Sequence, residues 1–505
     1  MNLRDKFVAR AKLSMEKKAG MGQDKALDRR TFLTRGAAVG VALGMNNAMT
    51  PETSAQGREK VARPNVIVYI ADQFRADFIA ANGQNYSAQT PNLDAMAARG
   101  TNFTGAICNQ PVCSPSRSIL MTGRYATETG VWHNSTNIDP SLPTLAEEFR
   151  KAGYSANLLG KWHLAPGTEA EGGGRGYVRP EFRSGFLDLW EGANEFEWTT
   201  HPYEGTIFDR DGKEITFKDE YRVDFVTDRA EKFLRQKHDK PFLLYISQLE
   251  PHFQNDEKRF IGPKGSAERF HDPCVPNDLR PLPGNWQSQL PDYYGCVEAI
   301  DQSVGRILKI LEEEKLTENT IVLFTSDHGC HFMTRNEEYK RSPHNSSIRI
   351  PLIVQGPGFD NAAELPEIIG NIHVMPTLLD AARIPIPASV KGTSVMPLLS
   401  QPEARKSWPN KELIQISESM TARALRTKEW TYCVIDAQGR RSEKFSDRYV
   451  EYQMYNQASD PFEQVNLAGR KEFRATADKL REELKSMMVE AGEPAAEIEA
   501  VKHYP

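Results

Sequence analysis

The alternation of short apolar runs with amphipathic stretches constrains the fold of this chain more than any other feature. Five continuous apolar runs occur, at residues 65–71, 154–159, 242–247, 320–326 and 350–354. Runs that lack a polar face predict strands buried on both sides, as in a parallel sheet. Helical patterns lie between them, at 91–99, 142–152, 222–237 and 293–314. Strands that alternate with helices predict an α/β fold with a mostly parallel central sheet flanked by helices.

The chain changes character near residue 397, where it becomes polar and proline-containing. Short strand patterns follow at 412–417, 422–426, 430–435 and 451–456, and a helical pattern at 470–490. We therefore expect a smaller C-terminal antiparallel-sheet subdomain. The predicted division of the chain is 1–55, 56–396 and 397–505, where 56–396 is the main α/β domain.

Residues 1–55 have the organisation of an export signal. The basic, polar start of the chain leads to Asp28-Arg29-Arg30-Thr31-Phe32-Leu33, and a mildly apolar segment follows at 36–49. Paired arginines before such a segment resemble a bacterial twin-arginine signal, and Thr53-Ser54-Ala55 offers a cleavage point after Ala55. The alternative is a disordered basic tail. The signal predicts export through the twin-arginine machinery to the periplasm or the exterior.

Composition excludes several other classes of protein. The net charge is -5, and Lys and Arg are scattered beyond residue 64, which argues against nucleic-acid binding. No apolar run reaches the ~18 residues of a membrane span. Six cysteines without a Cys-x-x-Cys pair indicate neither a disulfide framework nor a zinc site.

Polar residues of catalytic type follow three of the predicted strands. Asp72 follows the first apolar run, Lys161 and His163 follow the second, and Asp327 and His328 follow the fourth. Ligands of open α/β sheets bind at the carboxyl ends of the strands. We therefore expect these side chains to form one site.

Cys113 opens the most specific motif of the chain. The spacing Cys113-x-Pro115-x-Arg117 is followed by a helix-like Ser-Ile-Leu-Met segment. This spacing resembles the motif of the type I sulfatases, which have an alkaline-phosphatase-like fold. In that family the cysteine is oxidised to an aldehyde, formylglycine, which becomes the nucleophile. The alternative is a buried thiol that packs as a small hydrophobe.

The resemblance covers nearly all of residues 64–470 and implies a divalent metal. Family members hold it with residues that correspond here to Asp72-Gln73 and Asp327-His328, beside residue 113. Many arylsulfatases have Asp at position 73 and Asn at position 328, so this chain departs at both. The resemblance favours calcium, but a nitrogen donor leaves manganese, magnesium and zinc open.

The resemblance also implies the groups that grip the sulfate ester, because attack on sulfur moves negative charge onto its oxygens. It assigns Arg117 to the formylglycine. It places Lys161 and His163 of the Gly-Lys-x-His element beside the aldehyde and the sulfate. His252 corresponds to a histidine that contacts the sulfate, and Lys340 to the second sulfate-binding lysine. Each of the lysines could instead be an ordinary solvated side chain.

The reaction that the resemblance implies uses both hydroxyls of the hydrated aldehyde at position 113. One hydroxyl attacks sulfur, and the alcohol leaves with a proton from His252 or Lys340. The second hydroxyl loses its proton to His163 and expels sulfate, which restores the aldehyde. Asn134 lies where related enzymes place a polar substrate contact.

The expected function is hydrolysis of a sulfate monoester by an enzyme that a sulfatase-maturating enzyme has activated. Export favours a sulfated carbohydrate, with small aryl or alkyl sulfates as the next choice. Aromatic residues at 182–209 could stack on sugar rings or pack a lid. One alternative is a phosphonate or phosphate ester hydrolase of the same superfamily, although the Lys-x-His element favours a sulfatase. The other is a noncatalytic binding protein in which Cys113 stays unmodified.

Overall fold

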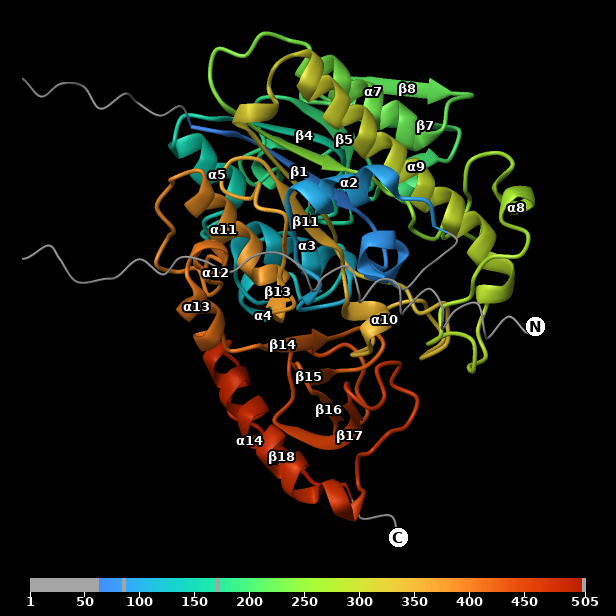
Figure 1. Cartoon of the computed structure of the whole chain (residues 1–505), viewed down its shortest axis with the longest axis vertical. Coiled ribbons are helices and arrows are strands. Elements are labelled where there is room, and N and C mark those ends of the chain that lie inside the picture. Colours follow the sequence, from blue (N-terminus) through green and yellow to red (C-terminus); the bar gives the residue numbers. More distant parts are fainter. Residues whose placement is uncertain (1–62, 84–87, 169–172, 502–505) are drawn as a thin grey trace, which may run out of the picture. The chain divides into compact units, whose positions relative to one another are not determined.

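One sheet of eleven strands organises the part of the chain that the structure describes (Figure 1). Its five central strands are parallel to one another. Their spatial order is β10 (Thr320–Ser326), β1 (Asn65–Ala71), β9 (Phe242–Ser247), β4 (Ser155–Lys161) and β5 (Trp190–Ala193). Every polar residue expected at a strand end therefore lies at the same edge. The predicted mostly parallel central sheet is confirmed.

The structure is a computed structural model that describes residues 63–83, 88–168 and 173–501. The predicted export signal, residues 1–55, lies outside these ranges. Among the described residues, no helix has both the length and the apolar character that a membrane span requires.

The outer strands of the sheet are short and mostly antiparallel. Beyond β10 the sheet continues through β11 (Leu352–Gln355), β2 (Thr101–Asn102) and β12 (Ala363–Glu364). Beyond β5 it continues through β7 (Glu204–Asp209), which pairs with β6 (Thr200–His201) and β8 (Glu214–Lys218). The sequence patterns predicted β11 but missed β2, β12 and the strands β5 to β8, which are short or carry mixed, partly exposed residues.

Helices cover both faces of the central sheet, because side chains of β1 alternate between two apolar cores. Val66, Val68 and Ile70 belong to one core, and Ile67 and Tyr69 belong to the other. The first core includes helices α3 (Cys113–Thr122), α5 (Leu145–Lys151) and α11 (Val374–Ala381). The second includes helices α2 (Pro91–Arg99), α7 (Arg222–Leu234) and α9 (Trp286–Glu313).

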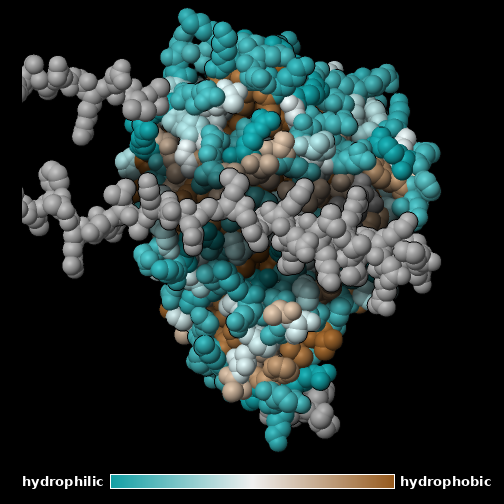
Figure 2. Space-filling model, viewed as in Figure 1, coloured by the Kyte–Doolittle hydropathy of each residue, from teal (hydrophilic) through white to brown (hydrophobic). Residues whose placement is uncertain are grey.

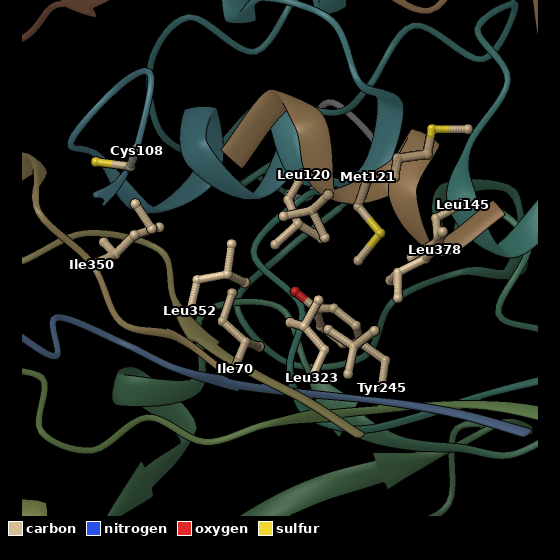
Figure 3. Packing of buried hydrophobic residues seen from close by; sticks show 14 of the residues in the cluster. Ile70, Cys108, Leu120, Met121, Leu145, Tyr245, Leu323, Ile350, Leu352 and Leu378 are labelled. Atoms are coloured by element: carbon tan, nitrogen blue, oxygen red, sulfur yellow. The ribbon is translucent and has the colours of Figure 1, made fainter. Parts of the chain in front are cut away.

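The first core holds α3, and with it Cys113, against the sheet. Figure 3 shows Leu120 and Met121 of α3 above Ile70 and Leu323 of the sheet. All four side chains are at most 2% exposed. Burial of each such side chain stabilises the fold by about 1.5–3 kcal/mol, so this contact fixes the position of α3.

Helix α9 begins seven residues before the predicted start at residue 293. Pro291 lies inside it and interrupts the sequence pattern, since proline removes a helical hydrogen bond. The buried side chain of Leu290 packs in the second core and supports the first turns of the helix.

A second, five-stranded sheet forms near the C-terminus, as predicted. Its antiparallel strands are β14 (Lys411–Ile416), β15 (Ala422–Thr427), β16 (Trp430–Asp436) and β17 (Arg448–Asn456). The short β18 (Glu497–Glu499) adds to β17 in parallel. Helix α14 (Arg474–Glu490) covers one face of this sheet. The residue boundaries at 55 and 396 stay predictions.

The C-terminal sheet packs on two sides. Leu413 and Leu425 lie in a core with Leu484 of α14. Ile414 and Ala424 point the other way and belong to the same core as α3.

The remaining short elements are β3 (Ala106–Ile107), α4 (Ala126–Thr129), α6 (Phe196–Thr199), α8 (Ser266–Arg269), α10 (Asn345–Ile348), β13 (Ile369–Gly370), α12 (Met396–Ser400) and α13 (Pro402–Ser407).

Hydrophilic residues cover most of the coloured surface in Figure 2. Large hydrophobic side chains that are clearly exposed are few among the described residues, and Trp198 is one of them at 40%. Tryptophan is enriched at binding interfaces, because its ring is apolar and its N–H can find a hydrogen-bond partner.

Candidate active site

Cys113 is the first residue of α3 and is buried at 1% exposure. The backbone leaves an extended conformation at Val112 and enters the helix at Cys113. The backbone N–H of Ser114 donates to Oδ1 of Asn134 at 3.1 Å. Asn134 therefore satisfies a free N–H of the first turn, and its predicted contact with substrate stays a prediction.

Three side chains converge on Sγ of Cys113, which stands in for the oxygen of the expected formylglycine. Nζ of Lys340 lies at 2.9 Å, Nε2 of His328 at 3.3 Å and Oδ1 of Asp72 at 3.6 Å. Burial opposes ionisation, but Lys161, Lys340 and His328 hold the pKa of the Cys113 thiol well below its usual range. The site therefore stabilises negative charge at this atom.

Asp72, Cys113, Asp327 and His328 form a candidate metal site. Their ligand atoms all lie within 4.8 Å of one another, and all four residues are buried. The two aspartates follow β1 and β10, whose last residues Ala71 and Ser326 pair in register. This donor set of carboxylates and one imidazole fits a divalent cation.

His328 is oriented for such a cation by its own backbone neighbourhood. Its Nδ1 lies 2.8 Å from the carbonyl oxygen of Gly329, so Nδ1–H donates there. Nε2 then faces Cys113 and Asp72, and its lone pair would be available to a cation once Nε2 has lost its proton. A second hydrogen bond of this kind fixes the tautomer of metal-binding histidines.

Gln73 has an unusual backbone at the end of β1. Its φ is 68°, a left-handed conformation that costs a non-glycine residue about 1–3 kcal/mol. Its backbone N–H donates to Oδ1 of Asp327 at 3.1 Å, while its side-chain amide donates to Sγ of Cys330 at 3.2 Å. The strained turn thus positions Asp327, and the role of Gln73 as a metal ligand stays a prediction.

Arg117 lies one helical turn beyond Cys113 and bonds side chains at the ends of three strands. It donates to Oδ2 of Asp72 at 3.1 Å and to Oδ2 of Asp327 at 3.0 Å. It also donates to Oγ of Ser247, at the end of β9, at 2.8 Å. Removing Arg117 would leave two buried carboxylates without this charged partner.

Lys161 ends β4 and is held between two buried carboxylates. Its Nζ lies 2.8 Å from Oδ2 of Asp72 and 3.2 Å from Oε2 of Glu197. Although burial favours the neutral amine, these carboxylates raise the pKa of Lys161. Burial opposes the charge of Glu197 as well, but Lys161 and nearby histidines lower its pKa to about 2.

Two buried histidines complete the site. Nε2 of His252 lies 3.4 Å from Nζ of Lys340, and a hydrogen bond from His163 also lowers the pKa of Cys113. Nδ1 of each ring is buried and has no hydrogen-bond partner within the described part of the chain. His163 has a left-handed φ of 61°. Unpaired buried polar atoms cost free energy, so they indicate places for a ligand.

The structure brings most of the predicted residues into one cluster and adds two that sequence reasoning missed. The clustered residues are Asp72, Cys113, Arg117, Lys161, His163, His252, Asp327, His328 and Lys340. Ser247 is the last residue of the predicted strand at 242–247, and that position was the signal for it. Glu197 lies in the aromatic segment without any motif.

Comparisons with known proteins agree with this geometry. Residues 64–384 match the Sulfatase family, and residues 338–490 match the family "N-sulphoglucosamine sulphohydrolase, C-terminal". An ulvan-active sulfatase of Formosa agariphila is 28% identical over 87% of this chain and 84% of the relative.

Solved structures share the fold. One, from work on glycosaminoglycan metabolism by Bacteroides thetaiotaomicron, has a TM-score of 0.74 and 22% identity, covering 86% of this chain and 97% of that one. A phosphonate monoester hydrolase of Agrobacterium radiobacter has a TM-score of 0.65 and 20% identity, over 85% and 96%. The fold alone thus does not separate the two activities, and the match to the Sulfatase family together with the relatives named sulfatases favours sulfate ester hydrolysis. The chain is a sulfuric ester hydrolase and belongs to the sulfatase family of the alkaline-phosphatase-like superfamily.

Proposed function

We propose that this enzyme hydrolyses a sulfate monoester of a carbohydrate, with a formylglycine made from Cys113 as its nucleophile and a divalent metal in the site. The observation that carries the proposal is the surroundings of Sγ of Cys113. Lys340 lies 2.9 Å away, and a candidate metal site includes the same sulfur atom. Such an arrangement favours an oxygen nucleophile and an anionic substrate at one position.

The aldehyde at residue 113, once hydrated, supplies one hydroxyl to attack sulfur and a second to expel sulfate. The side chains around it then have separate tasks. Lys161 and Lys340 bind the sulfate oxygens, where negative charge develops. His252, beside Lys340, donates a proton to the leaving oxygen. His163 accepts the proton of the second hydroxyl.

Calcium is the metal that we propose, held by Asp72, Asp327 and His328 beside residue 113 and completed by Gln73. When bound, the cation would offset the two carboxylates and favour ionisation of a hydroxyl at residue 113. Metal analysis of the purified enzyme distinguishes calcium from manganese, magnesium and zinc. Chelation should abolish turnover, and the native ion should restore it at the lowest concentration.

An exposed platform beside the site supports a carbohydrate substrate. The guanidinium of Arg175 lies over the ring of Trp198 at 4.2 Å from its centroid. Arg175 also pairs with Glu195 at 3.3 Å. Glu197, next to Trp198, contacts Lys161 of the site. An aromatic face can stack on a sugar ring, and arginine can bind a sugar carboxylate or second sulfate. The relative named for activity on ulvan supports the same substrate class.

The test compares a small and a large substrate. Trp198→Ala should lower kcat/KM on a sulfated oligosaccharide roughly ten-fold and leave kcat/KM on an aryl sulfate unchanged. Tyr452→Ala is the matched control, because Tyr452 is 41% exposed on the C-terminal sheet. Equal losses on both substrates would contradict the carbohydrate proposal. A preference of the wild-type enzyme for phenylphosphonate esters over aryl sulfates would favour the phosphonate alternative instead.

We further propose that the twin-arginine machinery exports the folded enzyme to the periplasm or exterior, after a sulfatase-maturating enzyme has oxidised Cys113 in the cytoplasm. The arginine pair Arg29-Arg30 and the cleavage point after Ala55 support this route. Replacing both arginines by lysine should retain the enzyme in the cytoplasm of a bacterial host with full turnover. Unchanged export would contradict the proposal.

A further inference from the structure

A cavity of about 280 Å³ lies between the main part of the chain and the C-terminal sheet. Thr104, Arg349 and Pro366 line it from one side, and Arg426 and Glu463 line it from the other. No residue of the nucleophile cluster belongs to its lining. The cavity is therefore a site separate from Cys113.

Three arginines that line the cavity lack a carboxylate partner. Among the described residues, none of Arg335, Arg349 and Arg426 makes an ion pair with an aspartate or glutamate. They bond neutral acceptors instead: Nη1 of Arg335 donates to the carbonyl of Glu463 at 2.8 Å, and Nη2 of Arg349 to that of Thr104 at 2.9 Å. Nε of Arg426 donates to an amide oxygen at 3.3 Å. Their positive charges are thus not matched by a direct ion pair, and Glu463 attracts Arg426 without contacting it in a salt bridge.

The pKa of Arg426 reflects the absence of a directly paired carboxylate. Its side chain is buried, with the residue only 6% exposed. Burial, together with repulsion by Arg349, lowers the pKa of Arg426 to about 10, against the attraction of Glu463. An anion in the cavity would relieve both effects.

Two further polar atoms of the lining have no partner. Oγ of Ser346, a residue 7% exposed, and Nε of Arg335 are both buried and form no hydrogen bond with any residue that the structure describes. Both can donate a hydrogen bond. A ligand that offers several acceptor oxygens would satisfy them and the arginines together.

The carboxylates that line the cavity form no ion pair with these three arginines in the described part of the chain. Asp77 and Asp278 both pair with Arg75, at 2.6 and 2.8 Å. Glu463 accepts hydrogen bonds from neutral donors, among them the backbone N–H of Asn345 at 2.7 Å. The full lining holds five cations against three carboxylates: Arg75, Arg335, Arg349, Arg426 and Lys428 against Asp77, Asp278 and Glu463.

We propose that this cavity binds an oxyanion of the sulfate or phosphate class, as a second anion site distinct from the nucleophile site. Arg335, Arg349 and Arg426 supply the positive charge, and Ser346 supplies a neutral donor. The bound anion would join α10 to β15, because Ser346 lies in α10 and Arg426 in β15. It would thereby stabilise the contact between the main part of the chain and the C-terminal sheet.

The first experiment locates the anion directly. Crystals soaked in selenate are measured at the selenium edge, and two anomalous peaks are expected, one beside Cys113 and one among Arg335, Arg349 and Arg426. A peak at the nucleophile site without one in the cavity would overturn the proposal. Parallel soaks with a sugar sulfate, using the Cys113→Ala variant, distinguish a free oxyanion from one carried on a larger ligand.

The second experiment separates the two sites in solution. Titration calorimetry with sodium sulfate at constant ionic strength reports both sites, whereas product inhibition of aryl sulfate turnover reports only the nucleophile site. Arg426→Gln should weaken the cavity component at least about ten-fold, since a charged hydrogen bond is lost, and leave the inhibition unchanged. Arg448→Gln, at an exposed arginine of the same sheet, is the matched control.

Arg349→Gln and Arg426→Lys serve if Arg426→Gln does not fold. Arg349→Gln should weaken binding of the anion in the cavity. Arg426→Lys keeps the positive charge, so it should retain more anion binding than Arg349→Gln. An unchanged calorimetric isotherm in every folded variant would overturn the proposal, whatever the turnover of the enzyme.

Discussion

The carboxyl edge of the central sheet and the C-terminal sheet both bury charged side chains, but they treat them differently. In the C-terminal sheet, Nε of Arg423 donates to both carboxylate oxygens of Glu493 at 2.7 and 2.8 Å. Both side chains are 1% exposed. The other nitrogens of Arg423 bond the carbonyls of Ala422 and Lys444. This pair is complete within the protein.

In the nucleophile site, by contrast, some buried polar atoms have no hydrogen-bond partner among the described residues. His163 and His252 each bury a ring nitrogen without a partner. Asp72 and Asp327 share Arg117 and also face Cys113 in a cluster that fits a cation. Buried groups that the protein leaves unpaired are expensive. Of the two regions, the nucleophile site is the one that combines unpaired ring nitrogens with two carboxylates able to hold a cation, and this combination marks where substrate and metal belong.

Two buried cysteines give the largest test of this difference. Cys113→Ala should lower turnover of an aryl sulfate by at least roughly 10³-fold, because the nucleophile is lost. Cys433→Ala, which removes a fully buried thiol from the C-terminal sheet, should leave kcat within a factor of a few. Assays on folded, purified variants check both. Retained activity in Cys113→Ala would refute the assignment of the nucleophile.

The ion pair of Arg423 and Glu493 should contribute to the stability of the fold but not to turnover. Arg423→Ala leaves the buried charge of Glu493 without its cation, with a hydrogen bond from Gln415 remaining, and should lower the free energy of unfolding by about 3–5 kcal/mol. Denaturant unfolding measures this loss, with Arg448→Ala as the exposed control, expected at or below about 1 kcal/mol. A large loss of kcat/KM in folded Arg423→Ala, with little loss of stability, would contradict the assignment of stability to this pair and of catalysis to the nucleophile site.

A lysine in each region tests catalytic charge. Lys161→Ala should lower kcat/KM roughly 10²–10³-fold, because a cation that stabilises the transition state is removed. Lys411→Ala breaks the partly exposed contact with Glu483 in the C-terminal sheet and should leave kcat/KM unchanged. Steady-state kinetics decide. A Lys161→Ala enzyme within three-fold of wild type would show that Lys161 is structural only.

The smallest effect concerns His331, whose Nε2 bonds the carbonyl of Lys340 at 3.0 Å. Burial lowers the pKa of His331 to about 3, so the folded protein keeps this ring neutral. The unfolded chain protonates it below about pH 6.5, and the stability that the neutral ring contributes is lost as pH falls from there towards 3. Between pH 7 and 5.5 the wild type should lose about 1 kcal/mol more unfolding free energy than His331→Gln. Parallel curves would contradict this.

Much of the fold was predictable because it depends on local patterns. The bounds of β9 and β10 agree with the predicted strands at 242–247 and 320–326, since these runs are apolar throughout. Strands β5 to β8 were missed, because they are short and β7 and β8 carry mixed, partly exposed residues. The three-residue β18 carries no detectable pattern.

The site was predictable where a motif or a strand end marks the residue. Cys113 and Lys161 carry motifs, and Asp72 and Asp327 follow buried strands. Glu197 has neither, and it joins the site only because Lys161 reaches it across the fold. Sequence also could not show that the amide of Gln73 bonds Cys330, since that depends on a left-handed turn.

The central claim is that turnover requires an aldehyde at residue 113. The most direct measurement is mass spectrometry of the peptide that contains residue 113, made on enzyme produced with and without a maturating enzyme. Aryl sulfate turnover is measured on the same preparations. Turnover should rise in proportion to the fraction of peptide that carries formylglycine, and preparations that contain only cysteine should be inactive. Full turnover with unmodified Cys113 would contradict the account.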